Sequence, residues 1–227
     1  MFKFLINPSI SPAGNVWQSN AIQTLRNLKV NIITMSYQQE CAWPRGVLYA
    51  KRDIQLINEY EKWIKYVNLP YLRDWLIYVN IYQAILAYIR KNGTPEFIIT
   101  YNPCKHNLLI GKAITKKNIK WINIWADSYG VGKRFEKASK ILYKAYSHIF
   151  LSYYAYQNSP YKKNTHLEGG ICSIKANRPS SVKYQINLLY TGMFDSWGGV
   201  DLLVKAFNKI NNDKLRLTIC GFGKLTK

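Results

Sequence analysis

Acidic side chains are scarce in this sequence. Its 12 Asp and Glu residues stand against 32 Lys and Arg residues, which gives a formal net charge of +20 at pH 7. A field of that sign attracts polyanions such as nucleic acid, an anionic membrane surface or a diphosphate-bearing substrate. A biased base composition of the gene would raise the Lys content in the same way, so the charge alone assigns no partner.

Paired metal-binding and disulfide motifs are also absent. The four cysteines, at positions 41, 104, 172 and 220, form no C-x-x-C pair, and no two histidines stand at metal-ligand spacing. This pattern argues against a zinc site or a disulfide framework and favours reduced thiols in a cytosol. We therefore expect no metal and a cytoplasmic location.

Long apolar runs are missing as well. No stretch approaches about 18 uninterrupted apolar residues, and the apolar run at residues 2–6 is too short for a signal peptide. Apolar residues nevertheless make up 48% of the chain, enough to bury a sizeable core. The sequence predicts a globular protein without a membrane span.

The common nucleotide-binding motifs are incomplete. The loop after the first apolar run is not G-x-G-x-x-G, and Gly132-Lys133 and Gly223-Lys224 lack the earlier glycine of a Walker loop. Nicotinamide oxidoreductases, kinases and nucleoside triphosphatases are therefore poorly supported, and we expect no cofactor.

Apolar runs and helical periodicities alternate along the first two thirds of the chain. Residues 2–6, 30–35, 97–100, 121–125 and 149–151 have the pattern of buried strands, and residues 17–28, 54–67, 72–89, 109–114 and 135–145 have helical spacing. Strict alternation implies parallel strands with crossover helices. We predict an α/β fold with a doubly wound Rossmann-like sheet.

A second unit follows a polar stretch at residues 173–183 that is typical of a linker. Residues 186–190, 200–210 and 215–220 indicate a strand, a helix and a strand, with a glycine-rich loop at 191–199. We predict one domain at 1–178 and an incomplete one at 185–227. A complete second sheet needs on the order of 100 further residues, so we expect truncation within this domain.

Residues 188–224 carry the most specific pattern. They contain Leu-Leu-Tyr-Thr-Gly-Met-Phe, then Gly-Gly-Val-Asp-Leu-Leu-Val-Lys-Ala-Phe, then Leu-Arg-Leu-Thr-Ile-Cys-Gly-Phe-Gly. This stretch resembles the start of the C-terminal domain in family 4 glycosyltransferases of the GT-B fold. The resemblance implies an acceptor-side N-terminal domain and transfer of a sugar from a nucleotide-diphosphate sugar. It implies a saccharide or lipid-linked acceptor in cell-surface polysaccharide synthesis, and no metal.

The resemblance also assigns donor-side residues. It places Gly192, Gly221 and Gly223 at the donor, but Met193 and Gly198 stand where the family commonly has the Arg and Lys that hold the diphosphate. Paired glutamates of the family would lie beyond residue 227. Without these groups the leaving diphosphate lacks most of its charge stabilisation, so we expect no sugar transfer by this chain alone.

On the acceptor side, three residues are candidates. Asp127 ends a predicted strand and can orient an acceptor hydroxyl or act as a base, or it is a helix N-cap. Gly14 and Asn15 lie in the first strand-to-helix loop, where ligands approach the backbone, although Gly14 also fits an ordinary turn. The scattered His106, His148 and His166 are interpreted as structural or exposed.

Aromatic and basic residues mix at positions 60–91. This mixture suits an anionic membrane surface at the inner face of the cell membrane, or a Tyr-rich core with solvated Lys tips. The alternative function is a non-catalytic basic module that binds membrane or nucleic acid through charge. No nucleic-acid motif occurs and the basic residues are dispersed, so a specific nucleic-acid partner is not expected. The sequence assigns no donor sugar, acceptor, linkage or stereochemistry.

Overall fold

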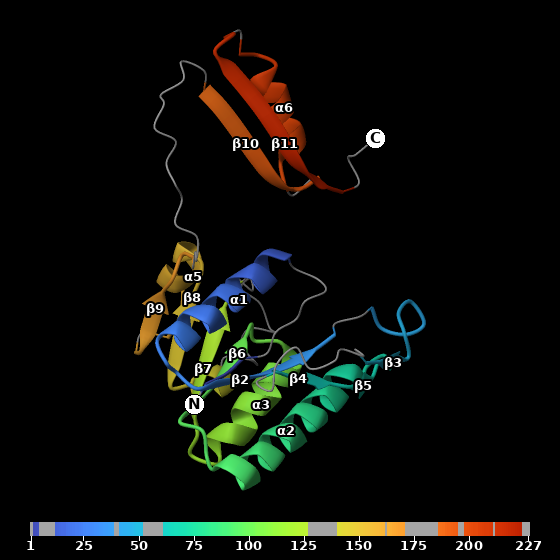
Figure 1. Cartoon of the computed structure of the whole chain (residues 1–227), viewed down its shortest axis with the longest axis vertical. Coiled ribbons are helices and arrows are strands. Elements are labelled where there is room, and N and C mark those ends of the chain that lie inside the picture. Colours follow the sequence, from blue (N-terminus) through green and yellow to red (C-terminus); the bar gives the residue numbers. More distant parts are fainter. Residues whose placement is uncertain are drawn as a thin grey trace. The chain divides into compact units, whose positions relative to one another are not determined.

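A computed structural model of the chain describes residues 2–4, 12–38, 41–51, 61–126, 140–161, 163–170, 186–194, 198–210 and 212–223. The chain divides into two compact units, residues 1–174 and 175–227, and each is described by itself (Figure 1). The predicted linker at 173–183 lies outside the described residues. The domain limits at 178 and 185 therefore stay a prediction.

The first unit alternates strands and helices. Its helices are α1 (Pro12–Asn27), α2 (Arg73–Asn92), α3 (Lys105–Thr115) and α5 (Tyr153–Gln157). Its strands are β1 (Phe2–Phe4), β2 (Ile32–Tyr37), β3 (Tyr49–Ala50), β4 (Glu61–Ile64), β5 (Tyr66–Val67), β6 (Phe97–Tyr101), β7 (Lys120–Trp125), β8 (Ser147–Phe150) and β9 (Thr165–Leu167).

Parallel pairing sets the strand order of the first unit. One sheet has the order β1-β2-β4 and another the order β6-β7-β8-β9, and every pair in both is parallel. β1 also contacts β6, so the two sheets lie side by side and the direction of strand addition reverses between β1 and β6. In open α/β sheets such a reversal marks the ligand-binding edge, at the carboxyl ends of the strands.

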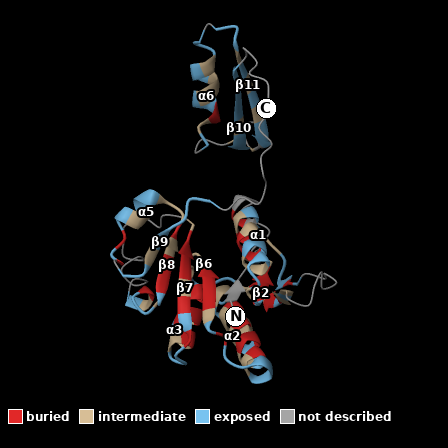
Figure 2. Cartoon of the chain, turned by 60° about the vertical axis from the view of Figure 1, so that its left-hand side comes forward, coloured by how far each residue is buried: buried red, intermediate tan, exposed pale blue. Residues whose placement is uncertain are grey.

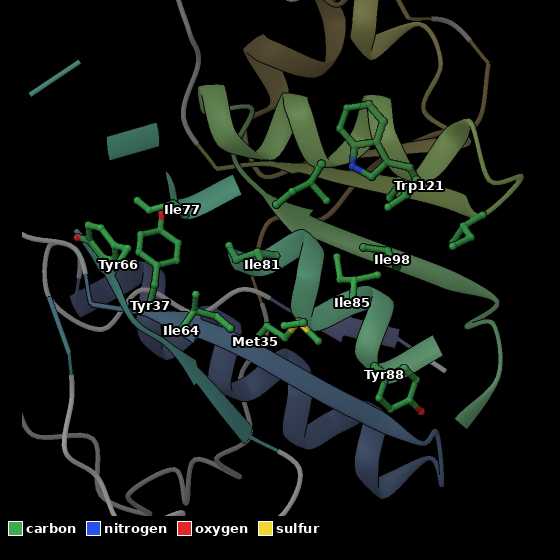
Figure 3. Packing of buried hydrophobic residues seen from close by; sticks show 14 of the residues in the cluster. Met35, Tyr37, Ile64, Tyr66, Ile77, Ile81, Ile85, Tyr88, Ile98 and Trp121 are labelled. Atoms are coloured by element: carbon green, nitrogen blue, oxygen red, sulfur yellow. The ribbon is translucent and has the colours of Figure 1, made fainter. Parts of the chain in front are cut away.

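One face of these sheets packs against α2 and α3. Ile77, Ile81 and Ile85 of α2 belong to one buried cluster with Met35 of β2 and Trp121 of β7 (Figure 3). Figure 2 shows buried residues along the strands and along the inner sides of these two helices. This face carries the larger of the two cores because two helices cover it.

The opposite face packs against α1. Ile22 of α1 lies in a second buried cluster with Ile99 of β6 and Ile124 of β7. The neighbouring residues Ile98 and Trp125 belong to the first cluster. Successive strand residues point to opposite faces, so these continuous apolar runs fill both cores and explain why the strands lack alternation.

Trp121 fixes how closely α3 approaches the sheet. The ring is fully buried, and its Nε1 donates to Thr100 Oγ1 of the neighbouring strand at 2.8 Å. A Cβ on Gly111 of α3 would lie 2.5 Å from three carbon atoms of this ring. The helix reaches this depth because position 111 has no side chain.

One predicted helix is wrong in the part that the structure describes, and the boundaries of other elements differ from the prediction. The spacing at 54–67 predicts a helix, but 61–64 and 66–67 form β4 and β5. Their apolar spacing fits the period of a strand as well as that of a helix, and pairing with β2 and β3 favours the strand. α1 begins at Pro12, so Gly14 and Asn15 lie in its first turn; proline favours a first helical position. Residues 191–193 extend a strand instead of forming a loop.

The part of the second unit that the structure describes is one strand-helix-strand unit. β10 (Ile186–Met193) pairs in parallel with β11 (Leu215–Phe222), and α6 (Val200–Phe207) connects them. Val200 is buried, whereas Leu188, Leu189 and Leu202 stay exposed. Parallel strands are normally covered on both faces, so the described part of this unit leaves these three leucines without cover.

Among the described residues, no helix combines the length and apolar character needed to cross a bilayer.

Changing Gly111 to Ala tests the close packing of α3. In an exposed helix interior this change stabilises by about 1 kcal/mol. Here the added methyl group meets the buried Trp121 ring, so we expect net destabilisation of about 1–3 kcal/mol. Urea unfolding followed by tryptophan fluorescence measures the difference in free energy of unfolding.

Gly169→Ala is the matched control. Gly169 is exposed, and no atom lies within 4 Å of the place that its added methyl group would take, so its stability should change by less than about 0.5 kcal/mol. A Gly111→Ala protein as stable as the parent would contradict the proposed packing.

Candidate functional site

Four polar side chains from three parts of the chain meet at the carboxyl ends of β2 and β6. Tyr37 is the last residue of β2, and Asp74 lies in the first turn of α2. Cys104 is the N-cap of α3, and His106 lies in its first turn. We call these four residues the His106 cluster.

The imidazole of His106 is the centre of the cluster. Its Nδ1 lies 3.1 Å from Asp74 Oδ1, and its Nε2 lies 2.9 Å from Tyr37 Oη and 3.3 Å from Cys104 Sγ. The side chain of His106 is 5% exposed and that of Asp74 is 31% exposed, so the carboxylate side reaches solvent. A doubly protonated ring donates to Asp74 through Nδ1 and to Tyr37 or Cys104 through Nε2.

Charge in the cluster follows from these contacts. Burial opposes protonation of His106, but the electrostatic interaction with Cys104 and the hydrogen bond with Asp74 outweigh it and raise the pKa of His106 to about 9. The hydrogen bond with His106 lowers the pKa of Asp74, and burial raises the pKa of Tyr37 well above its usual value. Near pH 7 the cluster therefore holds an imidazolium between a carboxylate and a neutral phenol.

Two asparagines order the backbone around Cys104. Asn107 Nδ2 donates to the carbonyl oxygens of Tyr101 at 2.8 Å and Asn102 at 2.9 Å. Asn102 has a φ of 61°, a left-handed conformation that asparagine tolerates, and its Oδ1 accepts from the amide of Ala126 at 2.8 Å. These bonds hold the ends of β6 and β7 together beside the cluster.

The start of α1 lies at the same edge. The rings of Trp17 in α1 and Tyr101 at the end of β6 are 6.0 Å apart. Gly14 is buried, and its carbonyl oxygen accepts from Gln18 Nε2 at 3.2 Å. The side chain of Asn15 lies outside the described residues. The cleft roles predicted for Gly14 and Asn15 stay predictions.

Asp127, the predicted catalytic residue, lies outside the described residues. The preceding Ala126 ends the described segment directly after β7. Its amide is held by Asn102, so the chain leaves β7 at the carboxyl edge. A role for Asp127 therefore stays a prediction.

The three glycines assigned to the donor side come together in the second unit. Gly192 of β10 is the register partner of Gly221 of β11, and a Cβ on Gly221 would collide with the Gly192 carbonyl oxygen. A Cβ on Gly223 would collide with the backbone of Phe194. The glycines thus allow a close backbone approach at the carboxyl ends of both strands, and donor binding by them stays a prediction.

His148 has a structural role, as the sequence suggested. Its Nδ1 accepts from Trp125 Nε1 at 3.0 Å, and its ring stacks on Tyr161 at 4.2 Å between centroids. Burial lowers the pKa of His148 to about 4. His166 is exposed. Interpreting His106 as an ordinary structural residue missed its charge and its partners.

The sequence held one usable signal for the His106 cluster. Tyr37 closes one predicted strand and Cys104 and His106 follow another, and the carboxyl ends of parallel strands meet at one edge. Asp74 stands 32 positions before His106, and no local pattern connects them. Among the described residues, no three or more His, Cys, Asp or Glu side chains are arranged so that they could hold a metal ion.

A separate open groove lies between α2 and α3. It is lined by Tyr78, Tyr82, Leu109, Lys112, Ala113, Lys116 and Lys117. The rings of Tyr78 and Tyr82 stack at 5.8 Å, and three lysines border them, which makes this groove a competing site for anions.

Comparisons with known proteins connect this geometry to a fold. No family model and no curated protein sequence matches the chain. The structure is similar to that of a protein described as a UDP-N-acetylglucosamine 2-epimerase from Listeria monocytogenes, with a TM-score of 0.51, 10% identity, and coverage of 96% of this chain and 61% of that one. It is also similar to S. aureus MnaA in a co-structure with UDP, with a TM-score of 0.51, 12% identity, and coverage of 99% and 62%.

These similarities show the fold. The chain has an α/β fold with parallel sheets of the GT-B type, as the sequence predicted. It spans about three fifths of the length of the two structures, 61% and 62%. At 10–12% identity the likeness says nothing further about chemistry.

Replacing Asp74 with Asn tests the charge of the cluster. The pKa of His106 is higher in the folded chain than its ordinary 6.5, so protonated His106 stabilises the fold. This contribution to the free energy of unfolding is complete below about pH 6.5 and is lost as the pH rises through about 9. The pKa of Asp74 is lowered, so its contribution is lost in acid. We expect Asp74→Asn to cost roughly 1–2 kcal/mol at pH 5.5, allowing for the exposure of Asp74, and less at pH 9.5.

Urea unfolding at the two pH values measures this difference. Asp213→Asn, at an exposed position in the second unit, is the control and should show no such pH dependence. A cost for Asp74→Asn that is equal at both pH values would show that His106 does not carry the proposed charge.

Proposed function

We propose that the protein is a nucleotide-sugar enzyme of the glycosyltransferase type. Its donor is a nucleotide-diphosphate sugar, and its acceptor is a saccharide or lipid-linked saccharide of cell-surface polysaccharide synthesis. Residues 1–178 form the acceptor side, and residues 185–227 begin the donor side. The observation that carries the proposal is the GT-B fold, shared with a structure that contains UDP.

The arrangement within each unit supports this proposal. The first unit has its reversal of strand order between β1 and β6, and the second unit gathers Gly192, Gly221 and Gly223 at the carboxyl ends of parallel strands. Both are positions where α/β sheets bind ligands. The resemblance of residues 188–224 to family 4 glycosyltransferases favours sugar transfer over epimerisation.

The donor side lacks cations at two positions. Met193 ends β10, and Gly198 precedes the N-cap of α6. A diphosphate is held in proteins by charge-assisted hydrogen bonds worth about 1.5–3 kcal/mol each. We therefore expect weak diphosphate binding by this chain and no sugar transfer without further groups.

Titration of the ¹⁵N-labelled chain with UDP tests the donor site. We expect amide shifts at Gly192, Gly221 and Gly223 with a Kd on the order of 1 mM, because backbone donors act without cations. Met193→Arg should tighten binding about tenfold by supplying one charge-assisted bond. Met193→Gln, which adds length without charge, is the matched control and should leave the Kd unchanged.

Two outcomes would reject the proposal. One is a set of UDP-induced shifts confined to the groove between α2 and α3, which would indicate attraction by lysines alone. The other is a Met193→Arg protein that binds UDP no better than the Met193→Gln control.

A second candidate role is peripheral attachment to an anionic membrane, which a lipid-linked acceptor would require. Segment 41–50 is tied to residues 66–69, since Asn68 Nδ2 donates to the carbonyl oxygens of Cys41 at 2.6 Å and Val47 at 2.9 Å. Exposed apolar side chains gather here and at the adjoining start of α2. We call them the aromatic surface: Trp43, Val47, Leu48, Tyr49, Tyr71, Leu72 and Trp75.

The chemistry of the aromatic surface fits a lipid interface. Tyr71 is 97% exposed and Trp75 is 52% exposed, whereas Tyr66 and Tyr88 are buried, so residues 60–91 supply both a core and a surface. Exposed Arg45 and Lys65 lie in or beside the same segments. Tryptophan and tyrosine insert at the headgroup level while cations attract anionic lipid.

Vesicle flotation measures this attachment. We expect binding to phosphatidylcholine vesicles only when phosphatidylglycerol is included, and an approximately tenfold loss in a Trp43→Ser, Tyr71→Ser, Trp75→Ser protein. The matched control changes Tyr143, Tyr153 and Tyr154 to Ser; these are 62%, 62% and 68% exposed on other parts of the chain. Equal loss in both proteins would contradict a role for the aromatic surface.

A further inference from the structure

Cys104 has surroundings that the other described cysteines lack. Its Sγ lies 3.3 Å from His106 Nε2 and 3.2 Å from Asn107 Nδ2, and the residue is the N-cap of the eleven-residue helix α3. Cys41 and Cys220 are exposed, and among the described residues no imidazole contact is found for either. The fourth cysteine, Cys172, lies outside the described residues.

We propose that Cys104 is a nucleophilic thiol and a site of oxidation by hydroperoxides, with His106 as its proton acceptor and donor and Asp74 as the residue that positions His106. The order Cys104–His106–Asp74 repeats the logic of nucleophile, base and orienting carboxylate. No part of the proposal depends on sugar transfer.

Donor groups converge on the sulfur from several directions. Protonated His106 donates toward Sγ, and the amides at the start of α3 add a positive field. Asn107 Nδ2 also contacts Sγ at 3.2 Å, beside its two shorter bonds to carbonyl oxygens. These are the groups that favour the thiolate form of a cysteine, which is the nucleophile. The Sγ contact with the Asn102 carbonyl oxygen is longer, at 3.6 Å, so His106 Nε2 is the nearer partner of the sulfur.

A second observation is an unpartnered buried acceptor on the residue that contacts the sulfur. Asn107 is 2% exposed, and its Oδ1 has no hydrogen-bond partner among the described residues. An unpartnered buried carbonyl oxygen costs about 1–3 kcal/mol unless a donor reaches it. The O–H of a hydroperoxide or of the product is such a donor, and the amide nitrogen of the same side chain contacts Cys104.

The structure also sets how solvent reaches Cys104 and which group competes with it for His106. Cys104 is half-buried, and the carboxylate of Asp74 is 31% exposed, so the cluster opens to solvent on that side. Tyr37 Oη competes for the same His106 Nε2 at 2.9 Å. Because burial raises the pKa of Tyr37, this phenol stays neutral and does not replace the thiol as the acid.

The reaction balances within these groups. In the reacting pair His106 already holds the proton at Nε2 and Cys104 is the thiolate, and the sulfur attacks the terminal oxygen of the hydroperoxide. An S–O bond forms as the O–O bond breaks, and the electron pair leaves on the departing alkoxide or hydroxide, which takes the proton from His106. The sulfur is oxidised by two electrons to a sulfenic acid, and the hydroperoxide is reduced to an alcohol or to water.

Peptide-resolved mass spectrometry of the intact chain tests the proposal without any substitution. The chain is reacted with limiting iodoacetamide at pH 7.5, and in parallel with hydrogen peroxide followed by dimedone. We expect Cys104 to be alkylated at least about tenfold faster than the more exposed Cys41 and Cys220, and to carry most of the dimedone label. Equal or slower modification of Cys104 would overturn the proposal.

Variants separate positioning from mere accessibility. Asp74→Asn keeps an acceptor for His106 Nδ1 but removes the charge, and should slow Cys104 alkylation about threefold to tenfold. Tyr37→Phe removes the competing hydroxyl and keeps the ring, so Cys104 should react at least as fast as in the parent.

The rates at Cys41 and Cys220 in the same digests report on folding. If the rate at Cys104 is unchanged by Asp74→Asn while these two internal controls are also unchanged, the positioning role of Asp74 is rejected.

Discussion

The parallel strand order, with β1 between β2 and β6, determines which parts of this chain meet. It places the carboxyl end of β2, the end of β6 and the starts of α2 and α3 at one edge of the sheet. Tyr37, Asp74, Cys104, His106 and Asn107 thereby lie close together although no local sequence pattern links them. The same order puts α1 on one face and α2 with α3 on the other, so two separate cores hold this edge in place.

Two buried histidines of the first unit show how the environment decides charge. His106 and His148 are 4% and 3% exposed, yet the pKa of His106 is raised to about 9 and that of His148 is lowered to about 4. Burial opposes charge in both. His106 has negative partners in Cys104 and Asp74, which overcome the loss of hydration, whereas His148 accepts a hydrogen bond from Trp125 and has no compensating negative charge in its described contacts. His106 is therefore a charged imidazolium near pH 7, whereas His148 is a neutral ring that packs in the core.

The fold is shown, but it does not by itself assign the chemistry of the donor side. A GT-B type α/β fold is shown, and it is compatible with more than one reaction of nucleotide sugars. Gly221 is required by the close approach of the Gly192 carbonyl oxygen whether or not a donor binds there. A glycine that strand packing already requires does not show that a ligand binds beside it. Whether a cation stands at the positions of Met193 and Gly198 is therefore the property that informs about diphosphate binding.

The alternation of strands and helices, the separate strand-helix-strand unit at 186–223 and the absence of the usual nucleotide motifs could all be read from the residues alone. These features depend on residue periodicity and glycine placement, which act over a few neighbouring positions. That 61–64 and 66–67 are strands followed from the folded structure, because pairing with β2 and β3 supplies hydrogen bonds that periodicity does not report. The folded structure alone joined Asp74 to His106 and Cys104, since hydrogen bonding and desolvation between distant residues exist only once the strands have paired.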